Sequence, residues 1–102
     1  MAPSHTLEQS PPAPGTAIRV SLEGKAIAVF NLGPNLYAID AACTHVHGPL
    51  ERGRVEGGVV TCPWHGSQFD LATGEVRRGP ATQPVHRYAV RVEAQKLVID
   101  LP

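Results

Sequence analysis

Cys43-Thr44-His45 and Cys62-Pro63-Trp64-His65 are two short stretches that each supply one thiol and one imidazole, with sixteen residues between His45 and Cys62. The chain contains only two cysteines, so both thiols belong to this pattern and none remains for a disulfide bond. A glycine follows each stretch, as Gly48 and Gly66. Two similar loops that face each other can place two sulfur and two nitrogen ligands around one inorganic centre. We therefore predict a metal site formed by Cys43, His45, Cys62 and His65.

This ligand set is typical of a Rieske centre, in which two thiolates hold one iron of a 2Fe-2S cluster and two histidines hold the other iron. A structural zinc ion also accepts two thiolates and two imidazoles. Zinc modules usually begin with Cys-x2-Cys, however, whereas the first loop here is Cys-x-His. A catalytic cysteine paired with histidine is a further alternative, but nothing else in the chain resembles a nucleophile site. We expect one 2Fe-2S cluster, and keep the zinc-binding module as an alternative.

His47 lies two residues beyond His45 and could compete with it as a ligand. We expect His45 to bind iron and His47 to be a solvent-exposed loop residue.

The length and the charge limit the classes of function. A chain of 102 residues forms one domain and buries roughly 65% of the surface that its unfolded form exposes. Nine acidic and nine basic side chains cancel, which argues against nucleic acid or an anionic membrane as the partner. Residues 1–14 carry four prolines among polar residues and contain no apolar stretch of membrane-spanning length. We expect a flexible segment there, no membrane anchor, and a reducing cytoplasm that protects the thiolate ligands.

Short apolar segments separated by turn residues predict an all-β protein. Residues 17–20, 25–32 and 36–40 form one such series, and 59–61, 69–76, 88–93 and 96–100 continue it. No window of eleven residues keeps a helical apolar period. We expect an antiparallel β-sandwich or small barrel, with a cluster-binding subdomain over residues 41–80 inserted between its strands. The expected core comprises Ile18, Val20, Ile27, Val29, Leu36, Ile39, Val59, Phe69, Val90, Val92, Leu97 and Ile99.

The two loops and their surroundings resemble the Rieske-type ferredoxins of bacterial multicomponent oxygenases. The similarity includes Gly48-Pro49-Leu50 after the first loop and Gly66-Ser67-Gln68-Phe69-Asp70 after the second, and covers all but about the first dozen residues. The resemblance implies a Rieske-like fold and a soluble carrier that takes one electron from a flavin-containing reductase and passes it to a terminal oxygenase. It implies no substrate site in this chain. The small Rieske-like subunit of a nitrite reductase is the second candidate. Some of those subunits lack the cluster ligands, whereas this chain has all four.

Two departures from high-potential Rieske proteins bear on the reduction potential. Those proteins carry an extra cysteine pair that bridges the loops, and the matching positions here are Gly48 and Trp64. They also direct a serine and a tyrosine hydroxyl at cluster sulfurs, which favours the reduced state. Ser67 stands at the position of that serine, whereas Phe69 stands at the position of that tyrosine and has no hydroxyl. We expect a potential in the lower half of the Rieske range of roughly −150 to +300 mV.

Overall fold

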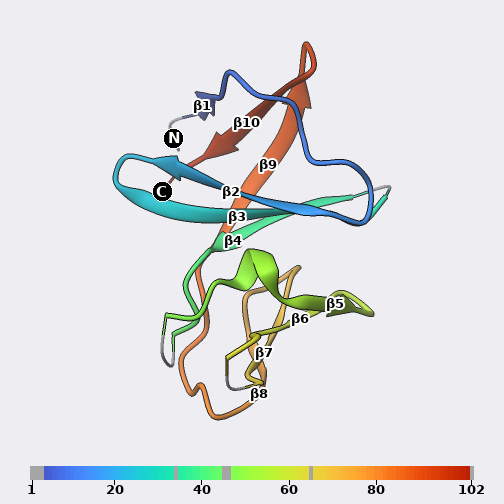
Figure 1. Ribbon diagram of the computed structural model, residues 1–102. Coiled ribbons are helices and arrows are strands. Elements are labelled where there is room, and N and C mark those ends of the chain that lie inside the picture. The colour runs from blue at the N-terminus through green and yellow to red at the C-terminus, as the bar shows by residue number, and fades with distance from the viewer. Residues whose placement is uncertain (1–3, 34, 45–46, 65, 102) are drawn as a thin grey trace.

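The computed structural model describes residues 4–33, 35–44, 47–64 and 66–101 as two antiparallel sheets, one above the other in Figure 1. The larger sheet has six strands in the order β1-β10-β9-β4-β3-β2. Their bounds are β1 Ser4–Thr6, β2 Ala17–Leu22, β3 Lys25–Asn31, β4 Leu36–Asp40, β9 Arg87–Glu93 and β10 Lys96–Asp100. Each neighbouring pair is antiparallel. This sheet is the base of the molecule.

The smaller sheet is formed by the chain between β4 and β9. It begins after a short 3-10 turn, η1, and has four strands in the order β5-β6-β7-β8. The bounds are η1 Leu50–Arg52, β5 Arg54–Glu56, β6 Val59–Thr61, β7 Gln68–Asp70 and β8 Val76–Arg78. The prediction of an all-β fold built from antiparallel strands is confirmed, because η1 is the only helical element of the described residues. Both loops with the Cys-His pattern adjoin this sheet, and residues 41–80 contain all of it.

Strand β3 explains why one sheet supports two separate cores. Its alternate residues point to opposite faces, so Ile27 and Val29 join one buried cluster while Ala28 and Phe30 join the other. The first cluster lies within the base sheet and includes Leu97 and Ile99 of β10. The second contains side chains of the smaller sheet and of both cysteine loops. All four of these β3 side chains are buried, which explains why the sequence of this strand is apolar at successive positions rather than at alternate ones.

Most of the expected core is buried, with one clear error. Val20, Ile27, Val29, Ile39, Phe69, Leu97 and Ile99 are at most 5% exposed, whereas Ile18, Leu36, Val59 and Val90 are half-buried. Val92 is 44% exposed, so its assignment to the core was wrong. Strand β4 pairs with β9 only at Tyr88 and Arg87. The end of the β9–β10 hairpin therefore projects beyond the sheet, as Figure 1 shows at the top.

The N-terminal segment makes contacts that its composition did not indicate. Strand β1 adds to the edge of β10, where the Ser4 hydroxyl donates to an Asp100 carboxylate oxygen at 2.6 Å. Beyond it, the Leu7 N–H donates to the Leu97 carbonyl, and the Leu97 N–H donates to the Gln9 carbonyl. Residues 4–9 thus have backbone partners, and the flexibility expected for residues 1–14 stays a prediction. Within the described residues, no helix is both long and apolar enough to cross a bilayer.

Candidate metal centre

The two cysteine loops close with the same pattern of backbone hydrogen bonds. In the first, the Cys43 N–H donates to the Gly48 carbonyl at 2.9 Å and the His47 N–H donates to the Cys43 carbonyl at 2.8 Å. In the second, the Cys62 N–H donates to the Ser67 carbonyl at 2.7 Å and the Gly66 N–H donates to the Cys62 carbonyl at 3.1 Å. Each cysteine therefore bonds to the residue five positions later and accepts from the residue four positions later. The described residues of the two loops therefore share one pattern of closing hydrogen bonds.

This shared pattern makes His47 the counterpart of Gly66. Both residues have a left-handed backbone, with φ of 60° and 79°. The sequence pattern suggested instead that Gly48 and Gly66 correspond, because both are glycines. A non-glycine residue in this conformation costs roughly 1–2 kcal/mol, and the closing hydrogen bonds of the loop hold His47 there. His47 is exposed, as expected for a loop histidine.

The thiols of both loops are buried in the second core cluster. Cys43 is 0% exposed and Cys62 is 1% exposed, and no disulfide joins them. The loops also touch, because a Cβ atom placed on Gly48 would lie 2.5 Å from the Cys62 Sγ atom. Two buried thiols on matched, contacting loops suit a cofactor that takes one thiolate from each loop. His45 and His65, the two expected nitrogen ligands, lie outside the described residues.

A third loop, residues 79–84, completes this end of the molecule. The Thr44 hydroxyl donates to the Gln83 carbonyl at 2.6 Å, and the Ala81 N–H donates to the Ser67 Oγ atom at 3.0 Å. Ser67 is fully buried although its side chain is polar. Because its oxygen accepts from Ala81, its own O–H proton remains available to a second acceptor. The sequence indicated Ser67 but gave no signal for the contacts of Ala81 and Gln83, which join residues distant in sequence.

Trp64 and Phe69 have different surroundings in the second loop. Phe69 is fully buried in β7, as its place in the expected core predicted. Trp64 is 58% exposed. Its Cγ and Cδ2 atoms lie 3.3 Å from where a Cβ of Gly48 would be, so one part of the indole rests on the first loop while the rest meets solvent.

Asp40 fixes the point at which the chain leaves the base sheet for the cysteine loops. Its carboxylate accepts from the Tyr88 hydroxyl at 2.6 Å and from the His86 N–H at 2.9 Å. Its own N–H donates to the His86 carbonyl at 3.0 Å. Burial, and then the hydrogen bond to the Asp40 carboxylate, raises the pKa of Tyr88 above the ordinary value of about 10.

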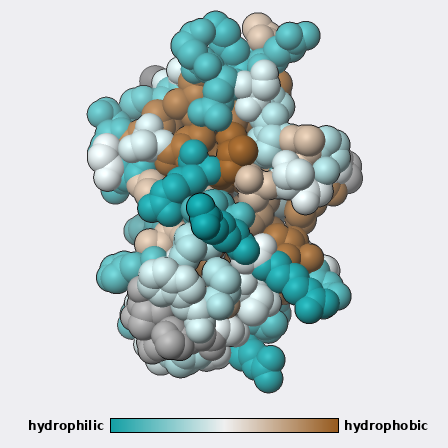
Figure 2. Space-filling model, in the orientation of Figure 1, coloured by the Kyte–Doolittle hydropathy of each residue, from teal (hydrophilic) through white to brown (hydrophobic). Residues whose placement is uncertain are grey.

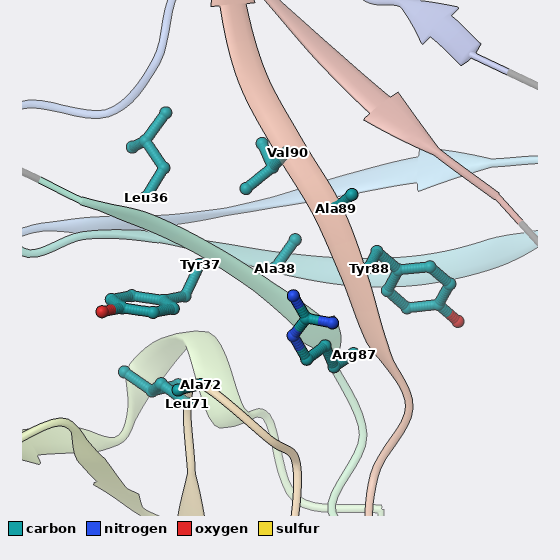
Figure 3. A pocket seen from close by; sticks show the side chains of 9 residues that line it. All are labelled: Leu36, Tyr37, Ala38, Leu71, Ala72, Arg87, Tyr88, Ala89 and Val90. Atoms are coloured by element: carbon teal, nitrogen blue, oxygen red, sulfur yellow. The ribbon is translucent and has the colours of Figure 1, made fainter.

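A shallow groove separates the base sheet from the loop after β7, and Figure 3 shows the nine residues that line it. Leu71 and Ala72 form one side, and residues of β4 and β9 form the other. Arg87 is its only charged residue, and Tyr37 and Tyr88 add two phenols. None of the described residues that line it supplies a carboxylate, a thiol or an imidazole.

Residues 4–89 match the family model of the Rieske [2Fe-2S] domain. The chain belongs to the Rieske [2Fe-2S] family. Its cofactor is accordingly one 2Fe-2S cluster of the Rieske type, and the loop geometry above fits the sulfur half of that cluster. This finding argues against the zinc alternative.

Relatives of this Rieske protein include named ferredoxins. The ferredoxin component of the naphthalene 1,2-dioxygenase system of Pseudomonas aeruginosa is 37% identical over 87 residues, which are 85% of this chain and 84% of the relative. The structure of the Sphingomonas yanoikuyae B1 ferredoxin superposes with a TM-score of 0.83 at 32% identity, covering 96% of this chain and all of that one. A chain in the complex of reduced oxygenase and oxidized ferredoxin of carbazole 1,9a-dioxygenase has a TM-score of 0.83 at 31% identity, with coverages of 93% and 92%.

Proposed function

We propose that this chain carries single electrons to a terminal oxygenase through a Rieske cluster ligated by Cys43, His45, Cys62 and His65. The thiolates of Cys43 and Cys62 would hold one iron of the cluster, and the imidazoles of His45 and His65 would hold the other. The observation that supports this assignment best is the matched pair of closed, contacting loops that bury Cys43 and Cys62. When bound, the cluster supplies a one-electron couple.

The chain's own residues prepare the site for that couple. The hydrogen bonds that close each loop hold Cys43 and Cys62 in fixed positions, and burial keeps water away from both sulfur atoms. Ser67 offers a hydroxyl proton close to Cys62, whose N–H donates to the Ser67 carbonyl. Fixed surroundings limit the rearrangement that accompanies a change of charge at the metal.

The electron donor in this proposal is a flavin-containing reductase and the acceptor is a terminal oxygenase. The relative from the naphthalene 1,2-dioxygenase system and the ferredoxin chain in the oxygenase complex support this choice of partners. The chain serves as an electron-transfer component without a substrate site of its own, and the chemistry takes place on the oxygenase. We place it in the cytoplasm, where a reducing environment protects thiolate ligands from oxidation.

Electron paramagnetic resonance at low temperature tests the proposal. The dithionite-reduced protein is expected to give a spectrum whose average g value lies below that of all-thiolate 2Fe-2S proteins, with two irons and two acid-labile sulfides per chain. The reduced protein is then mixed with the oxygenase of the naphthalene 1,2-dioxygenase system, which it is expected to reduce. A colourless protein with stoichiometric zinc would overturn the proposal. Stable association with a large nitrite reductase subunit, without cycling of the cluster, would favour the second candidate.

A further inference from the structure

The segments at the end of the molecule that carries the cysteine loops contain no acidic or basic side chains. Residues 41–50, 62–69 and 79–86 contain none of the chain's nine acidic and nine basic side chains. The hydrogen bonds from Thr44 to Gln83 and from Ala81 to Ser67 hold these three segments together. Much of the lower end in Figure 2 is correspondingly pale rather than deep teal. We call the described residues of these three segments, 41–44, 47–50, 62–64, 66–69 and 79–86, the tip.

The charges that flank the tip largely cancel. Residues 51–56 and 70–78 carry four carboxylates and four guanidinium groups. Arg77 binds Asp70 at 2.5 Å and Arg54 lies 3.5 Å from Glu56, while Glu51 pairs with Arg19 of β2 at 3.2 Å. A partner approaching this end therefore meets little net field, and opposite charge gives it little guidance.

Trp64 is the feature of the tip best suited to bind a protein. It is the only tryptophan in the chain, and it is 58% exposed although one part of the ring rests on Gly48. The other large apolar side chain with comparable exposure among the described residues is Val92, in the base sheet. Tryptophan is enriched among the few residues that dominate the binding energy of interfaces. Its support on Gly48 limits the conformational freedom that the indole would lose on binding.

These observations specify the chemistry of the partner surface. A lysine or glutamate of the partner that became buried against the tip would find no oppositely charged side chain there, and burying an unpaired charge is costly. An apolar recess without charged side chains has no such cost and gains the burial of the indole. We infer that Trp64 anchors the tip in an uncharged, apolar recess of the terminal oxygenase. This inference rests on the proposed function, because it requires that an oxygenase receives the electron.

Stopped-flow reduction of the oxygenase of the naphthalene 1,2-dioxygenase system by the dithionite-reduced protein tests the inference. Truncating an anchor residue typically weakens an interface by roughly thirtyfold, so Trp64→Ala is expected to raise the half-saturating concentration by about that factor. Trp64→Phe should recover most of the loss. Val92→Ala removes the exposed apolar side chain far from the tip and is expected to behave like the wild type. Raising NaCl from about 50 mM to about 500 mM should change the wild-type rate by less than about threefold.

Three outcomes would overturn the inference. The half-saturating concentration of Trp64→Ala could match that of the wild type. The wild-type rate of oxygenase reduction could fall more than tenfold as NaCl is raised. Trp64→Ala could slow only the reduction of the carrier by its reductase. Each variant must retain the wild-type visible spectrum and midpoint potential, and Trp64→Phe serves as the conservative probe if Trp64→Ala loses them. Failure of the wild-type protein to reduce the oxygenase would refute the proposed function itself. Normal reduction by wild type and Trp64→Ala alike would refute the anchor alone.

Discussion

Gly48 is a position where a single methyl group should prevent cofactor binding. A Cβ atom there would lie 2.5 Å from the Cys62 Sγ atom and 3.3 Å from the Trp64 ring, so Gly48→Ala forces the two loops apart. We expect Gly48→Ala to lower the iron content per chain by more than half, as measured by visible absorption and metal analysis.

Gly66→Ala is the matched control for Gly48→Ala. Gly66 has a φ of 79°, and nothing lies within 4 Å of its Cβ position. The substitution therefore costs only backbone strain, about 1 kcal/mol of unfolding free energy, and the counterpart residue His47 already tolerates a side chain in this conformation. Equal iron content in the two variants would show that the loops do not need to touch.

The choice between His45 and His47 as ligand is a second prediction at the scale of the residue. His45→Ala is expected to abolish the visible absorption of the cluster, because one iron loses a nitrogen ligand. His47→Ala should retain the absorption, and it leaves the backbone strain in place, because alanine also disfavours a φ of 60°. The reverse result, with colour lost only in His47→Ala, would assign the ligand to His47.

Substitutions at Ser67 and Phe69 should shift the midpoint reduction potential in opposite directions. Ser67→Ala removes the acceptor of the Ala81 N–H and the hydroxyl proton beside the cluster, so we expect a lower midpoint and about 1–3 kcal/mol less stability. Phe69→Tyr adds a hydroxyl donor and should raise the midpoint. Voltammetry of both variants is the measurement. Unchanged midpoints in both would mean that neither side chain reaches the cluster.

The strands illustrate what local sequence could predict. Turn residues and apolar alternation located β2, β3, β4, β6, β9 and β10 to within about two residues, because turn residues visible in the sequence flank these strands. Strands β1 and β5 were missed, because their pairing depends on partners rather than on composition. The equivalence of His47 and Gly66 was also missed. Hydrogen bonds hold His47 in a left-handed backbone conformation, which sequence patterns indicate only where a glycine is present.

The link between β4 and β9 should respond to alkaline pH through Tyr88. The pKa of Tyr88 is raised by burial and by the hydrogen bond to Asp40, so the folded state binds this proton more tightly than the unfolded state does. Its contribution to stability is complete below about pH 10 and declines as the pH rises further. We expect Tyr88→Phe to lose about 1–2 kcal/mol of unfolding free energy near neutral pH and to show a shallower decline above pH 10.

Tyr37→Phe is the control for Tyr88→Phe. Tyr37 is the only other tyrosine and is half-buried, and its hydroxyl has no hydrogen-bond partner in the part of the chain that the structure describes. Denaturant titrations at several pH values should therefore leave Tyr37→Phe close to the wild type. Equal losses in the two variants would indicate that ring packing, and not the bond to Asp40, joins the strands.

At the scale of the whole molecule, the two core clusters predict separate responses to loss of the cofactor. Both cysteines belong to the cluster that fills the smaller sheet, whereas the base sheet has its own apolar cluster around Ile27, Val29 and Leu97. Metal binding to a site whose ligands lie on loops stabilises the structure that holds those loops. Removal of iron should therefore loosen β5 to β8 first, while the base sheet retains its hydrogen bonds.

Hydrogen exchange of the iron-depleted protein measures this difference. Peptides from residues 54–78 are expected to exchange at least about tenfold faster than in the loaded protein, and peptides from β2, β3 and β10 to change little. Reconstitution with iron and sulfide should restore the slow exchange and thereby exclude chemical damage. Because β3 contributes side chains to both clusters, its amides are the decisive probe. Fast exchange there together with β5 to β8 would show that the two sheets unfold as one cooperative unit and that the cluster stabilises the entire chain.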